Sequence, residues 1–184
     1  ELAMHVKGLE IPGYDPRSLQ AMALGFAVGT RGADHNRSGA YELDFSDAVD
    51  RRAFDPEHAA RVVEVEDRTA AMDSLILCKF LRGVFGDFAA EGAELLRLVT
   101  GVRVDLMEVG ARVVSLRKLF NERAGWAAGD DTLPERLLQG ALSPSRLRAM
   151  IEVYYRARGW SPDGRVAPGT VRRLRLDSLP CPSR

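Results

Sequence analysis

The hydrophobic pattern along the chain predicts a series of α-helices rather than strands. Residues 16–28 form an apolar run that opens with an Asp-Pro pair at 15–16, which is typical of a helix start. A second Asp-Pro pair, at 55–56, opens another helix that we expect to extend to Leu81. Patterns that alternate between polar and apolar residues, which would indicate strands, are scarce. We therefore expect a predominantly all-α fold.

Further helices are expected in the second half of the chain, beginning with residues 88–99. In the helix after it, apolar residues repeat at intervals of three and four, which is the spacing of one helix face. This stripe spans fewer than about three heptads, so we expect a core-facing helix rather than a coiled coil. A short helix is expected at 132–140, and others at 143–158 and 168–176. The stripe consists of Leu106, Val109, Val113, Leu116 and Phe120.

Composition and charge exclude several classes of protein. Of 184 residues, 46% are hydrophobic and 28% are charged, which is ordinary for a soluble globular protein. The formal net charge is zero, so the chain has no general attraction for nucleic acid or for an anionic membrane. The basic run at 171–177 is short and has no interleaved aromatic residues, so we expect no nucleic-acid partner. With neither a long apolar run nor a signal peptide, we expect a cytoplasmic location and no membrane partner.

The length allows one substantial core or two small ones. We treat residues 1–184 as one helical region, with a division into two interleaved subdomains near 1–100 and 101–184 left open. The first residues resemble the interior of a longer sequence, so we expect this sequence to be a piece of a longer protein. Cys78 and Cys181 lie far apart, and Cys181 stands between prolines, so no disulfide framework is expected.

Asp73 and Cys78 are the first candidates for chemistry. Asp73 interrupts an apolar run, and a carboxylate buried there would need a partner, although an exposed position on a helix is its more common meaning. By default, a cysteine such as Cys78 is a small buried hydrophobe. Residues five apart on a continuous helix point about 140° away from each other. The two side chains can therefore converge only if the helix ends between them, and the spacing leaves both arrangements open.

His35 and Arg37 lie in the glycine-rich polar segment 29–39 and are the second candidates. A histidine can exchange a proton near neutral pH, and an arginine can hold a phosphate through paired hydrogen bonds. The glycines would allow the backbone to approach a ligand closely. A solvated loop is nevertheless the more common meaning of a His-x-Arg sequence.

Five segments, in this order, resemble the C-terminal part of the aldehyde ferredoxin oxidoreductase family. They cover nearly the whole chain, from about Val6 to Trp160, and their order is more specific than any one of them. The resemblance implies a tungsten or molybdenum enzyme with a bis-pterin cofactor and one [4Fe–4S] cluster. In that family two helical domains hold the pterins above a β-rich N-terminal domain, which would be absent here. The segments are VKGLEIPGYDPR, MALGFAVGTRGADHNRS, DSLILCKF, DDTLPERLL and YYRARGW.

The resemblance implies specific roles for the segment that contains Asp73. The family has a D-x-x-G-L-C motif, in which the aspartate binds one pterin and the cysteine is the last ligand of the iron–sulfur cluster. Asp73, Leu77 and Cys78 match this motif, so we expect the first two to bind cofactor and the cysteine to bind metal. Ile76 replaces the family glycine, which puts the backbone conformation of the turn in doubt.

The resemblance also implies a catalytic role for His35, which matches a histidine near the metal that is proposed to move protons. Arg37 matches a basic residue, often lysine, that reaches the pterin. The implied reaction oxidises aldehydes to carboxylic acids, and the protein positions and tunes the cofactor. The expected cofactors of the complete enzyme are tungstopterin, or molybdopterin, and a [4Fe–4S] cluster. The expected partners are the N-terminal cofactor domain, ferredoxin and an aldehyde substrate.

The chain supplies only part of such a site. A [4Fe–4S] cluster normally takes about four thiolates, of which Cys78 is the one credible ligand here. We therefore expect the isolated chain to bind neither cofactor and to be inactive; stoichiometric iron, sulfide and tungsten in it would overturn this. The alternative is a non-catalytic helical relic or interaction module of the same family. Retention of His35, Arg37 and Asp73 favours the enzyme, and Ile76 favours the relic; an upstream C-x-x-C-x-x-x-C run would decide.

Overall fold

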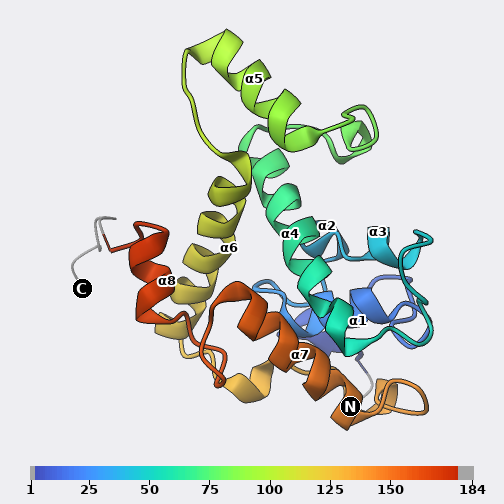
Figure 1. Ribbon diagram of the computed structural model, residues 1–184. Coiled ribbons are helices and arrows are strands. Elements are labelled where there is room, and N and C mark those ends of the chain that lie inside the picture. Colours follow the sequence, from blue (N-terminus) through green and yellow to red (C-terminus); the bar gives the residue numbers. More distant parts are fainter. Residues whose placement is uncertain (1–2, 178–184) are drawn as a thin grey trace.

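A computed structural model describes residues 3–177, and within this range the chain is built from helices (Figure 1). The paired strands are short: β1 (His5–Val6) and β2 (Leu9–Glu10) form an antiparallel hairpin. Over the same range, no helix has the length and apolar character needed to cross a membrane. The all-α fold class is confirmed. The α-helices are α1 (Gln20–Val28), α2 (His35–Ser38), α3 (Tyr41–Asp44), α4 (Ala59–Ser74), α5 (Phe88–Thr100), α6 (Leu106–Arg123), α7 (Pro144–Arg158) and α8 (Pro168–Arg173), and the 3₁₀ turns are η1 (Pro56–His58), η2 (Lys79–Leu81), η3 (Ala128–Asp130) and η4 (Glu135–Leu137).

Helix α1 begins later than the Asp-Pro pair at 15–16 predicts. The Asp15 carbonyl accepts a hydrogen bond from the Ser18 N–H at 3.0 Å, which makes a turn and not a helix start. Every residue of α1 is buried, so water cannot satisfy its first N–H groups. Asp44 does so instead, because its carboxylate accepts from the N–H groups of Ala21 at 3.0 Å and Met22 at 2.9 Å.

Helix α4 ends at Ser74 and does not continue to residue 81 as expected. The N–H of Leu77 bonds back to the carbonyl of Met72 at 3.0 Å, across a residue in the left-handed conformation. That residue is Ile76, with φ +58. This pattern is a Schellman C-cap, which terminates the helix and turns the chain.

The boundaries of α5 and α7 agree with the sequence pattern. Helix α5 closes at Gly101, whose φ of 76 is easy for glycine. Helix α7 begins at Pro144, and the Ser143 side chain accepts a hydrogen bond from the Arg146 N–H at 3.2 Å. The short helix expected at 132–140 is only the single 3₁₀ turn η4.

Helix α6 does not bury the whole predicted stripe. Leu106 is buried, but Leu116 is 44% exposed and Phe120 is 71% exposed. The prediction that these two residues face the core was wrong. The helix is rotated because Gly110 lies directly against the backbone of α4 and because the ammonium of Lys118 pairs inside with Asp131 at 2.9 Å.

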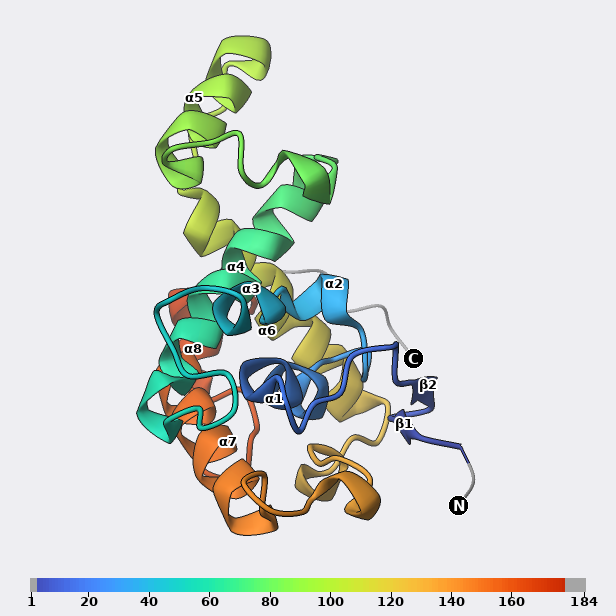
Figure 2. The same cartoon turned by 90° about the vertical axis from the view of Figure 1, so that its right-hand side faces the viewer.

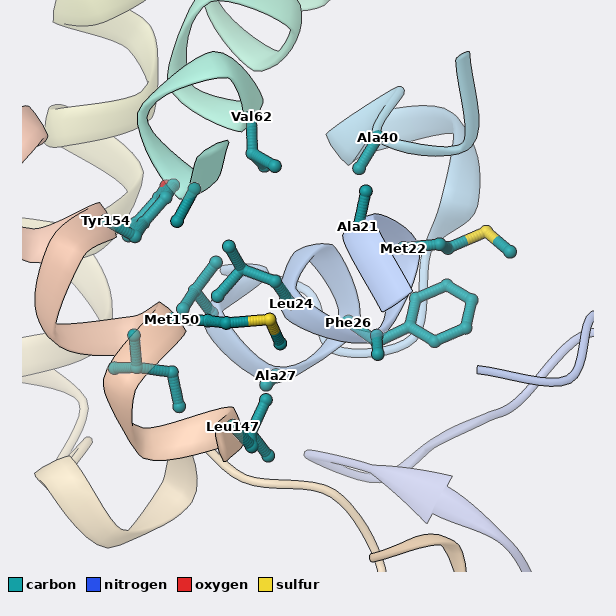
Figure 3. Packing of buried hydrophobic residues seen from close by; sticks show 14 of the residues in the cluster. Ala21, Met22, Leu24, Phe26, Ala27, Ala40, Val62, Leu147, Met150 and Tyr154 are labelled. Atoms are coloured by element: carbon teal, nitrogen blue, oxygen red, sulfur yellow. The ribbon is translucent and has the colours of Figure 1, made fainter. Parts of the chain in front are cut away.

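The larger hydrophobic core surrounds α1 and draws on both halves of the chain. Figure 3 shows Leu24 and Ala27 of α1 facing Met150 and Leu147 of α7. Helix α4 packs along α6 and also contacts α7. The proposed division into two subdomains stays a prediction.

A smaller arm, formed by η2, α5 and their loops, extends from the ends of α4 and α6 (Figures 1 and 2). Its own core is small, with Met72, Phe88 and Leu106 among its buried residues. The outer side of α5 leaves Leu98 67% exposed and Val99 77% exposed. The arm therefore carries more uncovered apolar surface than the body of the molecule.

Candidate functional site

The glycine-rich segment 29–39 holds helix α2 in a defined position. The Asp34 carboxylate accepts hydrogen bonds from the backbone N–H groups of Asn36 at 3.0 Å and Arg37 at 3.2 Å. It therefore caps α2, and the Arg31 guanidinium pairs with the same carboxylate at 2.9 Å. Capping places His35 and Arg37 on one short helical turn.

Two glycines of this segment pack against the chain itself, and the expected approach of their backbone to a ligand stays a prediction. A Cβ on Gly32 would lie 2.0 Å from the carbonyl oxygen of Val6, and its φ is +83. A Cβ on Gly39 would lie 2.5 Å from Oγ1 of Thr69. The glycines thus let the loop pack closely on β1 and α4.

Arg37 and Asp73 meet at the end of α4, although they lie far apart in sequence. The Arg37 guanidinium donates to the Asp73 carboxylate at 3.0 Å. Lys79 pairs with the other oxygen of Asp73 at 2.8 Å and also donates to the Thr69 carbonyl at 2.9 Å. Asp73 is therefore partly buried between two cations and is not a lone exposed charge.

His35 lies beside two aromatic rings. The centre of its ring is 5.2 Å from that of Tyr14 and 6.0 Å from that of Tyr41. The Arg82 guanidinium lies 5.5 Å from the Tyr41 ring centre, and burial is the main factor that raises the pKa of Tyr41. Among residues 3–177, no hydrogen bond or ion pair joins the His35 side chain to Asp73.

Cys78 follows the turn that ends α4, and its side chain is exposed. The default expectation of a buried cysteine was therefore wrong. The helix end removes the geometric objection to Asp73 and Cys78 serving one site, because they no longer share a continuous helix. Leu77 is partly buried and packs against the small core of the arm. Its predicted contact with a cofactor stays a prediction.

The described residues contain no complete metal site. Over 3–177, no group of three or more histidine, cysteine, aspartate or glutamate side chains is arranged to hold a metal ion. Cys78 is the free cysteine in this range, and Cys181 lies outside the described residues. The donor set still fits part of a cofactor site, because it offers one accessible thiol and one oriented carboxylate.

Sequence reasoning missed three residues of this region. Lys79 was not predicted because a helix continuing to residue 81 would point its side chain away from Asp73. Tyr14 and Tyr41 lie in turn-rich segments where no periodic pattern reports on neighbours. The sequence signal that could have identified Lys79 is its position directly after Cys78, which matches the family motif.

The fold and this arrangement define an all-α protein that gathers its chemically suited residues beside one end of α4. Residues 1–176 match the family model described as aldehyde ferredoxin oxidoreductase, domains 2 and 3, and the chain belongs to the aldehyde ferredoxin oxidoreductase family.

Its relatives include tungsten-containing aldehyde ferredoxin oxidoreductases from three organisms. The protein from Pyrococcus furiosus is 33% identical over 95% of this chain and 31% of its own length. That from Pyrococcus abyssi is 31% identical over 97% of this chain and 32% of its own length. That from Thermococcus kodakarensis is 32% identical over 90% of this chain and 29% of its own length. The chain thus spans about a third of the length of these relatives.

Proposed function

We propose that this chain is the cofactor-facing helical part of a tungsten, or molybdenum, aldehyde ferredoxin oxidoreductase. The complete enzyme would oxidise aldehydes to carboxylic acids in the cytoplasm and pass electrons through a [4Fe–4S] cluster to ferredoxin. The observation that carries this proposal is the meeting of Arg37 and Asp73 at 3.0 Å, beside the turn that exposes Cys78. The family, and relatives whose names specify tungsten, support it.

In this proposal, Asp73 accepts hydrogen bonds from the ring nitrogens of a pterin. Arg37 and Lys79 orient its carboxylate from two sides, so the acceptor is in place before the ligand arrives. Arg37 is 42% exposed along its side chain, which leaves guanidinium N–H groups available to the same ligand. Leu77 would contact the cofactor from the arm.

Cys78 would provide the last thiolate of the cluster. Its side chain is exposed on a turn whose backbone is held by the hydrogen bond from Leu77 to Met72. One segment, 73–78, would then contact both redox groups. When bound, the tungsten or molybdenum cofactor would supply the two-electron oxidation, which protein side chains cannot perform.

His35 would move protons at the substrate side of the site. It belongs to the same short helix as Arg37, the residue that would reach the pterin. Tyr14 and Tyr41 flank the ring and limit the directions from which water reaches it. An imidazole so placed can take the proton released as an aldehyde hydrate is oxidised.

The N-terminal cofactor domain is the partner that we propose for the uncovered apolar surface. Ile76 is 92% exposed and Phe80 is 88% exposed, and both adjoin Cys78. Large apolar side chains of this kind, grouped at a site that needs further ligands, are typical of an interface. Relatives of three times the length contain the additional chain that such a contact needs.

A cysteine substitution in the full-length protein tests this proposal. In the Cys78→Ser variant, purified without oxygen, we expect loss of the low-temperature electron paramagnetic resonance signal of the reduced cluster. The matched control is Cys181→Ser, which should keep the signal. Equal cluster signals in the two variants would contradict the assignment of Cys78.

The alternative is a helical relic that no longer binds cofactor, and two observations favour it. Asp73 already has two cationic partners within the chain, and Ile76 occupies the position of the family glycine. A folded full-length protein that contains neither tungsten, molybdenum nor cluster iron would favour this alternative over the enzyme.

A further inference from the structure

A polar hollow of about 230 Å³ lies where the start of α6 meets the chain just after α8. Figure 1 shows α4 and α8 on opposite sides of α6. The residues that line this hollow include none of the proposed cofactor contacts, which lie on α2 and in the segment at the end of α4. The charged residues of the lining are Arg103, Asp105, Glu108, Arg112 and Arg175.

Arg112 brings an unsatisfied donor to this hollow. Its Nε atom is shielded from solvent and has no hydrogen-bond partner among the described residues. Over residues 3–177, its guanidinium also forms no ion pair. Nearly all buried polar groups of native proteins are hydrogen-bonded, so a donor without a partner indicates that a bound ion or water belongs beside it.

Two further guanidinium groups reach the same hollow from other parts of the chain. Arg103 is exposed in the loop between α5 and α6, and no described residue forms an ion pair with it. Arg175 follows α8 in the left-handed conformation, with a φ of 54. Three arginines from a loop, a helix and a turn therefore line one small volume. The planar fork of a guanidinium matches an oxyanion through paired hydrogen bonds, which favours such a ligand here.

The acidic residues of the lining do not neutralise these arginines. The Asp105 carboxylate caps α6, because it accepts from the N–H groups of Met107 at 2.8 Å and Glu108 at 3.1 Å. The Glu108 side chain is exposed. Within residues 3–177, neither carboxylate forms an ion pair with Arg103 or Arg112. The guanidinium groups outnumber the carboxylates, so the hollow keeps a net positive charge.

We propose that this hollow binds a small inorganic oxyanion such as phosphate or sulfate. Arg112 would donate from Nε and from one terminal nitrogen, and Arg103 and Arg175 would contact the remaining oxygens. The volume is below the range of about 300–1,000 Å³ that is typical of organic ligands, which favours an ion. The bound ion would connect the loop at the base of the arm to the end of α8. The proposal goes beyond the redox function and does not rest on it.

Inorganic phosphate is the probe for this site, titrated into the 184-residue chain at constant ionic strength. In nuclear magnetic resonance spectra, we expect the Nε–H signal of Arg112 to shift and then saturate; its absence from Arg112→Lys identifies it. By calorimetry, Arg112→Gln should weaken binding about tenfold or more, the usual effect of losing a charge-assisted contact. The matched control is Arg123→Gln, which removes an exposed arginine of the same helix outside the hollow and should leave the affinity unchanged.

Arg103→Gln provides a second test that does not depend on a partly buried residue. Because Arg103 is exposed, this variant should stay folded and should also bind phosphate more weakly. Circular dichroism shows which variants are folded, and Arg103→Gln decides the matter if Arg112→Gln unfolds. Equal affinities of the folded Arg103 and Arg123 variants, or an Arg112 signal that does not respond to phosphate, would overturn the proposal.

Phenyl phosphate and the full-length protein distinguish a free ion from other sources of an oxyanion. We expect phenyl phosphate to bind no more tightly than inorganic phosphate, since the hollow is small. Tighter binding of phenyl phosphate would contradict an inorganic ligand. In the full-length protein, phosphate should still bind and Arg112→Gln should still weaken it. If the full-length protein does not bind phosphate, because a carboxylate of the additional chain occupies the arginines, the free ion is not the native ligand.

Discussion

Ile76 holds a backbone conformation that its side chain opposes. Its φ of 58 lies in the left-handed region, which is a genuine outlier for a β-branched residue. The hydrogen bond from Leu77 to Met72 requires this conformation, because a Schellman cap needs a left-handed residue before its last donor. Glycine at this position, as in the family motif, would satisfy the same turn without strain.

Ile76→Gly should therefore stabilise the chain. The left-handed conformation costs a non-glycine residue about 1–2 kcal/mol. Glycine removes this strain, but part of the gain is offset because glycine loses more conformational entropy on folding. Ile76 is 92% exposed, so little buried apolar area is lost. We expect a gain of about 0.5–1 kcal/mol in the free energy of unfolding, measured by urea denaturation.

The matched control for this prediction is Ile76→Val, which keeps a β-branched side chain in the same conformation. It should leave the free energy of unfolding within about 0.5 kcal/mol of that of the unsubstituted chain, the usual range for surface positions. A glycine variant that is no more stable than the valine variant would show that the turn carries no strain.

The residue-scale features of the site were only partly predictable from the sequence. The pattern singled out His35, Arg37, Asp73 and Cys78, and the structure brings the middle two together. It could not predict that Arg37 and Lys79 share Asp73, because that pairing depends on where α4 ends. A chain that continued as a helix would have carried Lys79 elsewhere.

At the scale of elements, α1 depends on a carboxyl group supplied by α3. Asp44 is buried beneath the first turn of α1 and accepts from two of its N–H groups. Burial is the larger effect, and it raises the pKa of Asp44 to about 7 despite these two hydrogen bonds. The folded chain thus binds this proton more tightly than the unfolded chain, in which the pKa is about 3.9.

The sign of the resulting pH dependence follows from linkage. The contribution of Asp44 to stability is fully present below about pH 4 and is lost as the pH rises toward 7, at about 1.4 kcal/mol for each unit of pKa difference. In Asp44→Asn this dependence is absent. Comparing thermal unfolding of both chains at pH 4.5 and 7, we expect the original chain to lose more stability than the variant. Parallel pH profiles would contradict the raised pKa.

Helices α4 and α6 are in close backbone contact at Gly110. A Cβ there would lie 2.0 Å from the carbonyl oxygen of Asp67, which no rearrangement of a side chain relieves. Gly110→Ala must therefore separate the helices, and we expect a loss of about 1–3 kcal/mol in the free energy of unfolding. Chemical denaturation measures it.

Gly169→Ala is the control, because that glycine also lies in a helix but has open space around its Cβ position. Alanine should stabilise α8 slightly, by about 0.5–1 kcal/mol. Equal effects of the two alanines would show that α4 and α6 are not in close backbone contact at Gly110.

Element types were more predictable than the faces that they bury. Caps such as Ser143 and Gly101 mark α7 and α5 correctly because these signals are local. The predicted buried face of α6 was wrong in part, because the burial of Lys118 depends on Asp131, which lies beyond the helix. The predicted start of α1 was wrong because the carboxylate that caps this helix belongs to Asp44, which lies far away in sequence.

At the scale of the whole molecule, the helices form one body with an arm. Exposed apolar residues occur on the arm and beside Cys78. Since the chain spans about a third of the length of its relatives, we propose that the rest of the enzyme covers this surface. The chain contains two cysteines, fewer than the roughly four thiolates of a cluster, so we expect the other ligands to come from the rest of the enzyme.

The metal content of the full-length protein, purified without oxygen and measured by elemental mass spectrometry, tests whether this chain is the cofactor-facing part of an active enzyme. We predict stoichiometric tungsten, or molybdenum, together with the iron of one [4Fe–4S] cluster. A folded full-length protein that contains none of these metals would contradict the assignment of this chain to the cofactor-facing part of an active enzyme.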